Sequence, residues 1–263
     1  MKVPYQDLLE KLRQIRLTAF ATDVEELIQD DPQKAAVVLP ALERMVDGEL
    51  SHRKDRTIQR RIKDAQFVRM QTVDAFDFTY NASTQKLRKR YLQLLEAGPV
   101  EQAIGATFVG NSGLGKTHLA RALGYGACQR GHRVLFVTCS TMLNRLVAAE
   151  ATKNLEREVK RLEAQALLII DELAYVTMSH QEANLFFHVI SRRHDNDRPT
   201  VVTTNKRFAE WNQVFHADGT AHAIVDRLTE RAEIFFLEGP KSYRQTHRQG
   251  LNSKKPTKRP ERS

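Results

Sequence analysis

One eight-residue segment constrains the fold of this chain more than any other. Residues 110–117 read Gly-Asn-Ser-Gly-Leu-Gly-Lys-Thr and fit the spacing Gly-x-x-x-x-Gly-Lys-[Ser/Thr]. The segment lies between an apolar run at 103–109, which predicts a strand, and a stretch at 115–130 with helical spacing. A strand, a glycine-rich turn and a helix in this order predict a phosphate-binding loop. In such a loop the backbone N–H groups and the positive end of the helix dipole face the phosphates.

The side chains of this loop have different predicted tasks. Lys116 is expected to reach the β and γ phosphates of a nucleotide, and the hydroxyl of Thr117 is expected to hold Mg²⁺. The ring of His118, which follows, is interpreted as a packing or surface group. The residues predicted to contact the nucleotide are Gly110, Asn111, Ser112, Gly113, Leu114, Gly115, Lys116, Thr117 and His118.

From residue 103 onward, apolar strand patterns alternate with helical patterns. This alternation predicts an α/β domain with a parallel sheet. The other predicted strands are 132–138, 166–172, 199–205 and 233–238, and the helices after the loop are 140–163, 179–196, 207–215 and 220–232.

Three polar residues stand at the carboxyl ends of predicted strands, where ligands bind in α/β proteins. Asp171 ends the apolar run "LLII" and is expected to hold Mg²⁺ through water. Glu172 beside it can polarise a water for attack on the γ phosphate, which favours hydrolysis over transfer to a small acceptor. Asn205 ends "VVTTN" and can orient that water or sense the γ phosphate. The alternative for Glu172 is an ordinary acid at a strand end, and the alternative for Asn205 is an ordinary turn.

Three arginines are candidates for contacts with phosphate. Arg227 can stabilise charge on the nucleotide of a neighbouring subunit, and Arg231 competes with it for this task. The alternative for Arg227 is a surface ion pair with Asp226 or Glu230. Arg244 follows the last strand and can act within its own subunit.

Residues 4–98 have helical character. Breaks in the helical pattern are expected near Pro40 and around Gly48. Residues 73–81 predict an irregular connector, in which Phe76 and Phe78 either flank an adenine ring or anchor the connector in the core.

Positive charge is concentrated in two parts of the chain, whose total net charge is +9. Residues 51–95 hold 11 Lys and Arg against 4 Asp and Glu, and residues 240–263 hold 8 against 1. Such segments usually meet a polyanion, of which nucleic acid is the first candidate; the alternative is a solvated helix face and a solubilising tail. The candidate nucleic-acid residues are Arg53, Lys54, Arg56, Arg60, Arg61 and Lys63.

The composition argues against a membrane protein. No run of eighteen apolar residues occurs, and the first residues contain acids rather than an apolar block. Cys128 and Cys139 lack metal-ligand spacing and fit small apolar fillers in a reduced protein. The expectation is a cytoplasmic protein.

The segments "FVGNSGLGKTHLARAL", "LLIIDELAY", "NLFFHVISRRH", "TTNKRFAEWNQVF", "AIVDRL" and "SYR" together resemble the IstB-like helper ATPases of insertion-sequence transposition. These are initiator-clade AAA+ proteins related to the DnaC and DnaI helicase loaders. The resemblance runs from about residue 5 to 248. Asn111-Ser112 stand where the family often has Pro-Thr, and Ala174 stands where Gly is common; neither departure alters the assignment.

This resemblance implies an AAA+ P-loop NTPase core with a parallel sheet, preceded by a small all-helical domain. The predicted divisions are a helical N-terminal domain at 1–75 for DNA, partner or oligomer contacts, the ATPase domain at 76–245, and a basic tail at 246–263. The implied cofactors are ATP and Mg²⁺. The implied site roles are the metal ligands Thr117 and Asp171, the catalytic residues Glu172, Asn205 and Arg227, and the second-sensor arginine Arg244.

The implied function is ATP-dependent regulation of insertion-sequence transposition. The chain is expected to form a homo-oligomer on duplex DNA, deform it, and recruit or stimulate a partner transposase. A deformed duplex costs several kcal/mol, so many phosphate contacts over many subunits are needed. The alternative is a DnaC/DnaI-like loader of a replicative helicase. A third possibility is a nucleotide-gated DNA scaffold in which hydrolysis is only a timer.

Overall fold

The computed structural model describes residues 5–173, 175, 177–215 and 219–239. The chain divides into two compact units, Met1–Arg60 and Arg61–Ser263. In the described part of the chain, no helix combines the length and the apolar character that crossing a membrane requires.

The first unit is helical. Its core is formed by leucines and small apolar residues, among which Leu8, Leu12 and Leu39 are fully buried. They recur at the three- and four-residue spacing that brings side chains to one face of a helix. The helices are α1 (Gln6–Gln14), α2 (Thr18–Asp30) and α3 (Pro32–Asp64), and the last turn of α3 lies in the second unit.

The predicted breaks near Pro40 and Gly48 are wrong, because α3 runs without interruption through both residues. A proline inside a helix costs about 3 kcal/mol and a glycine about 1 kcal/mol. Leu39 and Val46 of α3 are buried in the core of the unit, and each contributes about 1.5–3 kcal/mol. Tertiary burial therefore offsets the local cost of both residues.

The second unit is built on a five-stranded sheet in the order β2-β3-β4-β1-β5, with every neighbouring pair parallel. This confirms the predicted α/β fold with a parallel sheet. Because β4 lies between β3 and β1, the carboxyl ends of these three strands are side by side. The strands are β1 (Gly105–Gly110), β2 (Val134–Thr138), β3 (Leu167–Leu173), β4 (Thr200–Thr204) and β5 (Ala232–Leu237).

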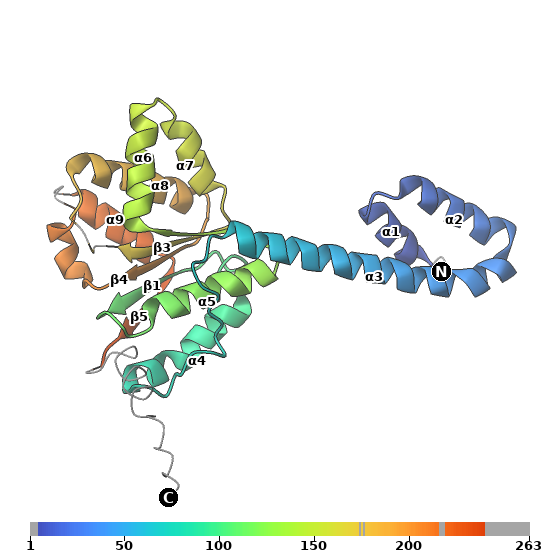
Figure 1. Cartoon of the computed structure of the whole chain (residues 1–263), viewed down its shortest axis with the longest axis horizontal. Coiled ribbons are helices and arrows are strands. Elements are labelled where there is room, and N and C mark those ends of the chain that lie inside the picture. The colour runs from blue at the N-terminus through green and yellow to red at the C-terminus, as the bar shows by residue number, and fades with distance from the viewer. Residues whose placement is uncertain (1–4, 174, 176, 216–218, 240–263) are drawn as a thin grey trace, which may run out of the picture. The chain divides into compact units, whose positions relative to one another are not determined.

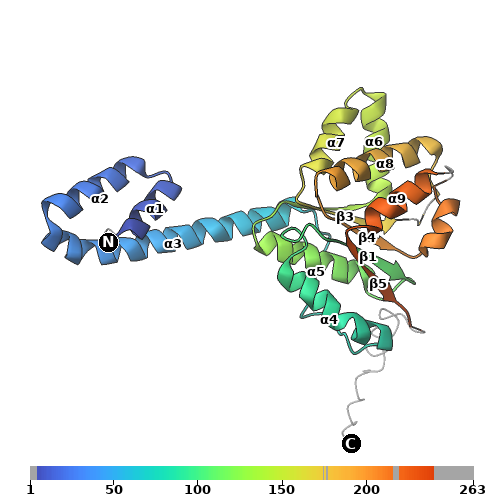
Figure 2. The same ribbon diagram turned by 180° about the vertical axis from the view of Figure 1, so that it is seen from behind.

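Helices cover both faces of this sheet (Figures 1 and 2). Alternate strand residues enter two separate cores: Ile169 and Val201 pack toward one face, and Ile170 and Val202 toward the other. The first face is covered by α4 (Ala82–Ala97) and α5 (Lys116–Gln129). The other face is covered by α6 (Cys139–Ala151), α7 (Leu155–Glu163), α8 (His180–Asp195) and α9 (Thr220–Thr229), with a short 3₁₀ helix η1 (Phe208–Gln213).

Residues 61–75, placed in the N-terminal domain by the sequence-based division, pack on the α/β unit. Arg61 Nε donates a hydrogen bond to the carbonyl of Gly131 at 3.1 Å. The N–H of Phe136 on β2 donates to the carbonyl of Ala65 at 2.9 Å. The structural division at 60/61 thus falls earlier in the chain than the predicted one at 75/76. The tail predicted at 246–263 lies outside the described residues.

Both cysteines are free and buried. Burial raises the pKa of each thiol, Cys128 and Cys139, to about 12. The thiols are therefore poor nucleophiles, as expected for apolar fillers.

Candidate nucleotide site

The glycine-rich segment forms a tight loop between β1 and α5 (Figure 1). Gly110, Gly113 and Gly115 all have positive φ, a backbone conformation that other residues rarely adopt. A Cβ at Gly110 would lie 2.1 Å from the carbonyl oxygen of Leu237 on β5. Across the loop, Lys116 Nζ donates to the carbonyl of Asn111 at 2.9 Å. This hydrogen bond joins the two ends of the loop and places the lysine amine beside Asn111, which is exposed, as is Ser112.

The connector before α4 packs against this loop. A Cβ at Gly115 would lie 2.4 Å from the ring of Phe76, so this glycine leaves the space that the ring fills. Phe76 also meets the ring of His118 edge-on, with the centroids 5.2 Å apart. Phe76 and Phe78 contact each other in the core of the unit, so both residues anchor the connector there.

Both ring nitrogens of His118 are engaged by the two residues that directly precede the connector. Nε2 lies 2.8 Å from the carbonyl of Thr72, and Nδ1 lies 3.2 Å from the side-chain amide of Gln71. Burial, with Arg121 nearby, lowers the pKa of His118, which favours a neutral ring that donates to Thr72 and accepts from Gln71. This ring therefore ties the start of the connector, through the residues just before it, to the first turn of α5.

Thr117 and Asp171 meet at the carboxyl edge of the sheet. The hydroxyl of Thr117 donates to Asp171 Oδ1 at 2.9 Å. Asp171 is only 4% exposed, and among the described residues no lysine or arginine forms an ion pair with it. A buried carboxylate without a cationic side chain, next to a hydroxyl, is an oxygen donor set of the kind that Mg²⁺ prefers. The residues present therefore fit a magnesium ion.

Thr203 is the residue of this site that sequence reasoning missed. It is buried on β4, and its hydroxyl donates to Asp171 Oδ1 at 2.6 Å. The hydroxyl oxygen of Thr203 in turn accepts a hydrogen bond from the backbone N–H of Glu172 at 3.0 Å. Glu172 has φ +62°, and the pairing of β3 with β4 is irregular between Ile170 and Leu173.

The side chain of Glu172 is exposed beside this buried pair. Its carboxylate forms no hydrogen bond or ion pair with the residues that the structure describes. A positive φ costs a non-glycine residue roughly 1–2 kcal/mol, and bulges often re-aim side chains next to active sites. The local backbone thus directs a free carboxylate to the edge of the sheet that carries the loop.

Asn205 follows directly on β4 and is exposed. The register places Thr204, the last residue of β4, opposite Val109 of β1 and Leu173 of β3. Asn205 therefore lies at the strand ends between the loop and Glu172. The turn after it is held by the hydroxyl of Thr204, which accepts the N–H of Lys206 at 3.1 Å.

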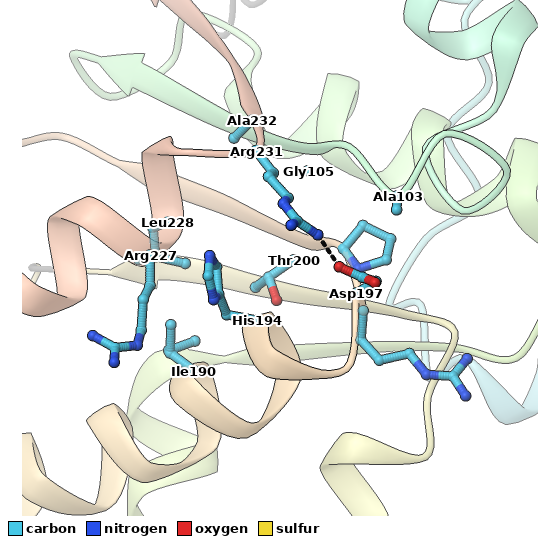
Figure 3. A pocket seen from close by; sticks show the side chains of 12 residues that line it. Ala103, Gly105, Ile190, His194, Asp197, Thr200, Arg227, Leu228, Arg231 and Ala232 are labelled. Carbon is cyan, nitrogen blue, oxygen red and sulfur yellow. Dashed lines mark hydrogen bonds and ion pairs between the residues drawn. The ribbon is translucent and has the colours of Figure 1, made fainter.

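Arg227 and Arg231 lie at the opposite, amino-terminal edge of the sheet (Figure 3). They line a cavity of about 30 Å³, formed where β1, β4 and β5 begin. This space is far too small for a nucleotide. Arg231 pairs with Asp197, whereas the guanidinium of Arg227 turns away from that pair and stacks 4.8 Å from the ring centre of Phe187. Neither arginine is near the loop of its own chain.

The candidate nucleic-acid residues fall into two groups. Arg53 and Arg61 donate to the backbone carbonyls of Ile15 and Gly131, so both have structural contacts. The others, Lys54, Arg56, Arg60 and Lys63, are exposed on α3, as Arg53 is, and Arg56 lies 3.6 Å from the carboxylate of Glu49. Arg244 lies outside the described residues, as does Ala174.

The chain matches the family described as IstB-like ATP binding protein over residues 10–250. It is 31% identical to the ATP-binding protein of insertion sequence IS232 from Bacillus thuringiensis subsp. berliner, covering 93% of this chain and 96% of that protein. It is 33% identical to the ATP-binding protein of insertion sequence IS21 from Pseudomonas aeruginosa, covering 89% and 86% respectively.

Solved structures with a similar fold include the DnaC helicase loader. The match has a TM-score of 0.56 at 23% identity and covers 64% of this chain and 96% of that one. AMPPCP-bound DnaA from Aquifex aeolicus matches with a TM-score of 0.55 at 17% identity, covering 69% and 55%. These likenesses concern the fold, and they confirm the predicted AAA+ P-loop core.

Proposed function

The chain belongs to the family of IstB-like ATP-binding proteins, and we propose that it is an ATP-dependent, DNA-binding regulator of insertion-sequence transposition. In this proposal it hydrolyses ATP, assembles on duplex DNA, deforms the DNA, and recruits or stimulates a partner transposase. The observation that carries the ATP-dependent part is the hydrogen bond between Thr117 and Asp171, which joins the phosphate loop to the acidic strand end. The link to transposition rests on the insertion-sequence relatives.

The loop residues Gly110 to Thr117 and the first turn of α5 bind the phosphates of ATP. The N–H groups at the start of α5 face an anion there, and Lys116 supplies a positive charge. Thr117 and Asp171 would hold Mg²⁺, which neutralises charge on the β and γ phosphates when bound. Arg244 is retained as a second contact from the same subunit.

Glu172 orients and polarises the water that attacks the γ phosphate. Its carboxylate is exposed and free of partners among the described residues, so it is available to a water molecule. Asn205, at the neighbouring strand end, holds the same water or the γ phosphate. These two residues lie on the same edge of the sheet as the loop, as this reaction requires.

An arginine acts between subunits. Arg227 and Arg231 lie at the edge of the sheet away from their own loop, so either can reach a nucleotide only on another copy of the chain. Arg231 already pairs with Asp197, which favours Arg227 for this contact. The site is therefore complete only in a homo-oligomer, as an arginine supplied in trans requires.

Exposed basic side chains of α3 contact the DNA backbone. Lys54→Gln together with Lys63→Gln should weaken duplex binding. The negative slope of log K against log salt should become about 1.8 less steep, since each phosphate contact contributes about −0.9 to it. Binding is measured by fluorescence anisotropy with ATP at several salt concentrations. The matched control is Arg157→Gln with Lys160→Gln, two exposed charges on α7. The control should keep the wild-type slope. If the α3 double variant kept it as well, the proposed role of α3 would be refuted.

A further inference from the structure

We propose that Thr203 is a positioning residue for ATP hydrolysis. Its hydroxyl fixes the carboxylate of Asp171 and the backbone of Glu172 in a single arrangement. This inference rests on the proposed function, because it assigns a task within the hydrolysis step. Thr203 itself touches neither nucleotide nor water in this proposal and acts through its two neighbours.

In each of the two hydrogen bonds of Thr203, the chemistry of the partner fixes which group donates and which accepts. A carboxylate can only accept, so the hydroxyl must donate its proton to Asp171 Oδ1, 2.6 Å away. A backbone N–H can only donate, so the hydroxyl oxygen must accept from Glu172, 3.0 Å away. The side chain of Thr203 is only 1% exposed. Its hydroxyl thus donates to Asp171 and accepts from Glu172, two consecutive residues of β3. Hydrogen bonds linked in this way strengthen each other.

The backbone at Glu172 needs such a partner. Regular pairing of β3 with β4 stops after Ile170 and resumes at Leu173, so in this gap a side chain takes the N–H of Glu172 in place of a strand carbonyl. The residue has φ +62° although it is not glycine. Unfavourable backbone conformations persist only where the surroundings hold them, and they occur at functional sites. The hydrogen bond from the N–H of Glu172 to Thr203 holds this backbone conformation.

Thr107 on the neighbouring strand provides a contrast. It is also 1% exposed, and it lies opposite Val202 in the register. Its hydroxyl has no hydrogen-bond partner in the described structure. A buried strand threonine in this sheet is therefore not a positioning residue by its type alone, and Thr107→Val is the matched control for Thr203→Val.

The test compares Thr203→Val, which keeps the shape and removes the hydroxyl, with Thr203→Ser, which keeps the hydroxyl. In Thr203→Val we expect the kcat of ATP hydrolysis to fall roughly 10- to 100-fold, the loss expected from misplaced catalytic groups. The affinity for ATP should stay near that of the wild type. In the nucleotide-free protein, the amide of Glu172 should exchange with solvent faster in Thr203→Val, as followed by hydrogen exchange of this residue. Thr203→Ser and Thr107→Val should match the wild type in both measurements.

The outcomes separate this inference from the proposed function. If Glu172→Gln hydrolyses ATP as fast as the wild type, the proposed role of Glu172 fails. If Glu172→Gln is inactive but Thr203→Val keeps the wild-type kcat and the protected amide, the positioning role alone fails. Should Thr203→Val not fold, Thr203→Ser decides, since a folded serine variant with low kcat or an unprotected Glu172 amide overturns the proposal.

Discussion

Glu172→Gln is expected to lower the kcat of ATP hydrolysis by a factor on the order of 10² to 10⁴, the usual contribution of a general base. The substitution keeps the size of the side chain but removes the charge that polarises the attacking water. The side chain of Glu172 has no partner among the described residues, so the substitution breaks no contact that stabilises the fold. The affinity for ATP should therefore remain near the wild-type value. Phosphate release at saturating ATP and titration with a fluorescent ATP analogue measure the two quantities.

The control for this substitution is Glu238→Gln. Glu238 is an exposed glutamate that directly follows β5, at the same edge of the sheet. Its carboxylate pairs only with the exposed Arg207 in the described residues, so its loss should leave kcat unchanged. Equal activity of Glu172→Gln and Glu238→Gln would show that Glu172 does not act on the water. Assembly of Glu172→Gln on DNA together with stimulation of the transposase would show that ATP binding supplies the function and hydrolysis resets it.

Arg193→Met is expected to destabilise the α/β unit by roughly 3 kcal/mol, the cost of leaving several buried polar groups without partners. The guanidinium of Arg193 is fully buried on α8, and that burial lowers the pKa of Arg193 to about 9. Methionine fills much of the same space but donates no hydrogen bonds. The acceptors that Arg193 holds are the carbonyls of Leu162, Glu163, Gln165 and Pro199 and the hydroxyl of Thr200.

Urea unfolding followed by tryptophan fluorescence measures this effect. The chain has one tryptophan, and Trp211 is fully buried in the α/β unit, so the signal reports on that unit. The control is Arg192→Met on the same helix. Within the described residues, the side chain of Arg192 forms only ion pairs with Glu156 and Glu163, and its loss should cost less than about 1 kcal/mol. Similar midpoints for the two variants would contradict the structural role of Arg193.

Much of the fold could be predicted from the sequence, because its local signals agree with one another. The loop motif follows an apolar run and precedes a helical pattern, and each later strand ends in a polar residue. In a parallel sheet these ends share one edge, so Asp171, Glu172 and Asn205 were predicted to lie near the loop. The structure places them there.

Other features depend on contacts that no local pattern contains. Thr203 follows two valines in a strand, where a β-branched residue is expected for its shape alone. Its task becomes visible only with the irregular pairing of β3. Similarly, Pro40 and Gly48 are local signals for a break, yet the buried face of α3 overrides them. The contact between Phe76 and Gly115 joins segments far apart in sequence and had no signal beyond the aromatic residues.

The most direct test of the proposed function is the binding of the purified chain to a labelled duplex and a labelled single strand, each with and without ATP. Lys116→Ala, which removes the charge of the phosphate loop, serves as the nucleotide-binding control. We predict tight duplex binding by the wild type only with ATP, loss of that binding in Lys116→Ala, and a steep decrease with salt. Equal duplex binding with and without ATP would contradict the account, and a preference for the single strand would favour a helicase loader instead.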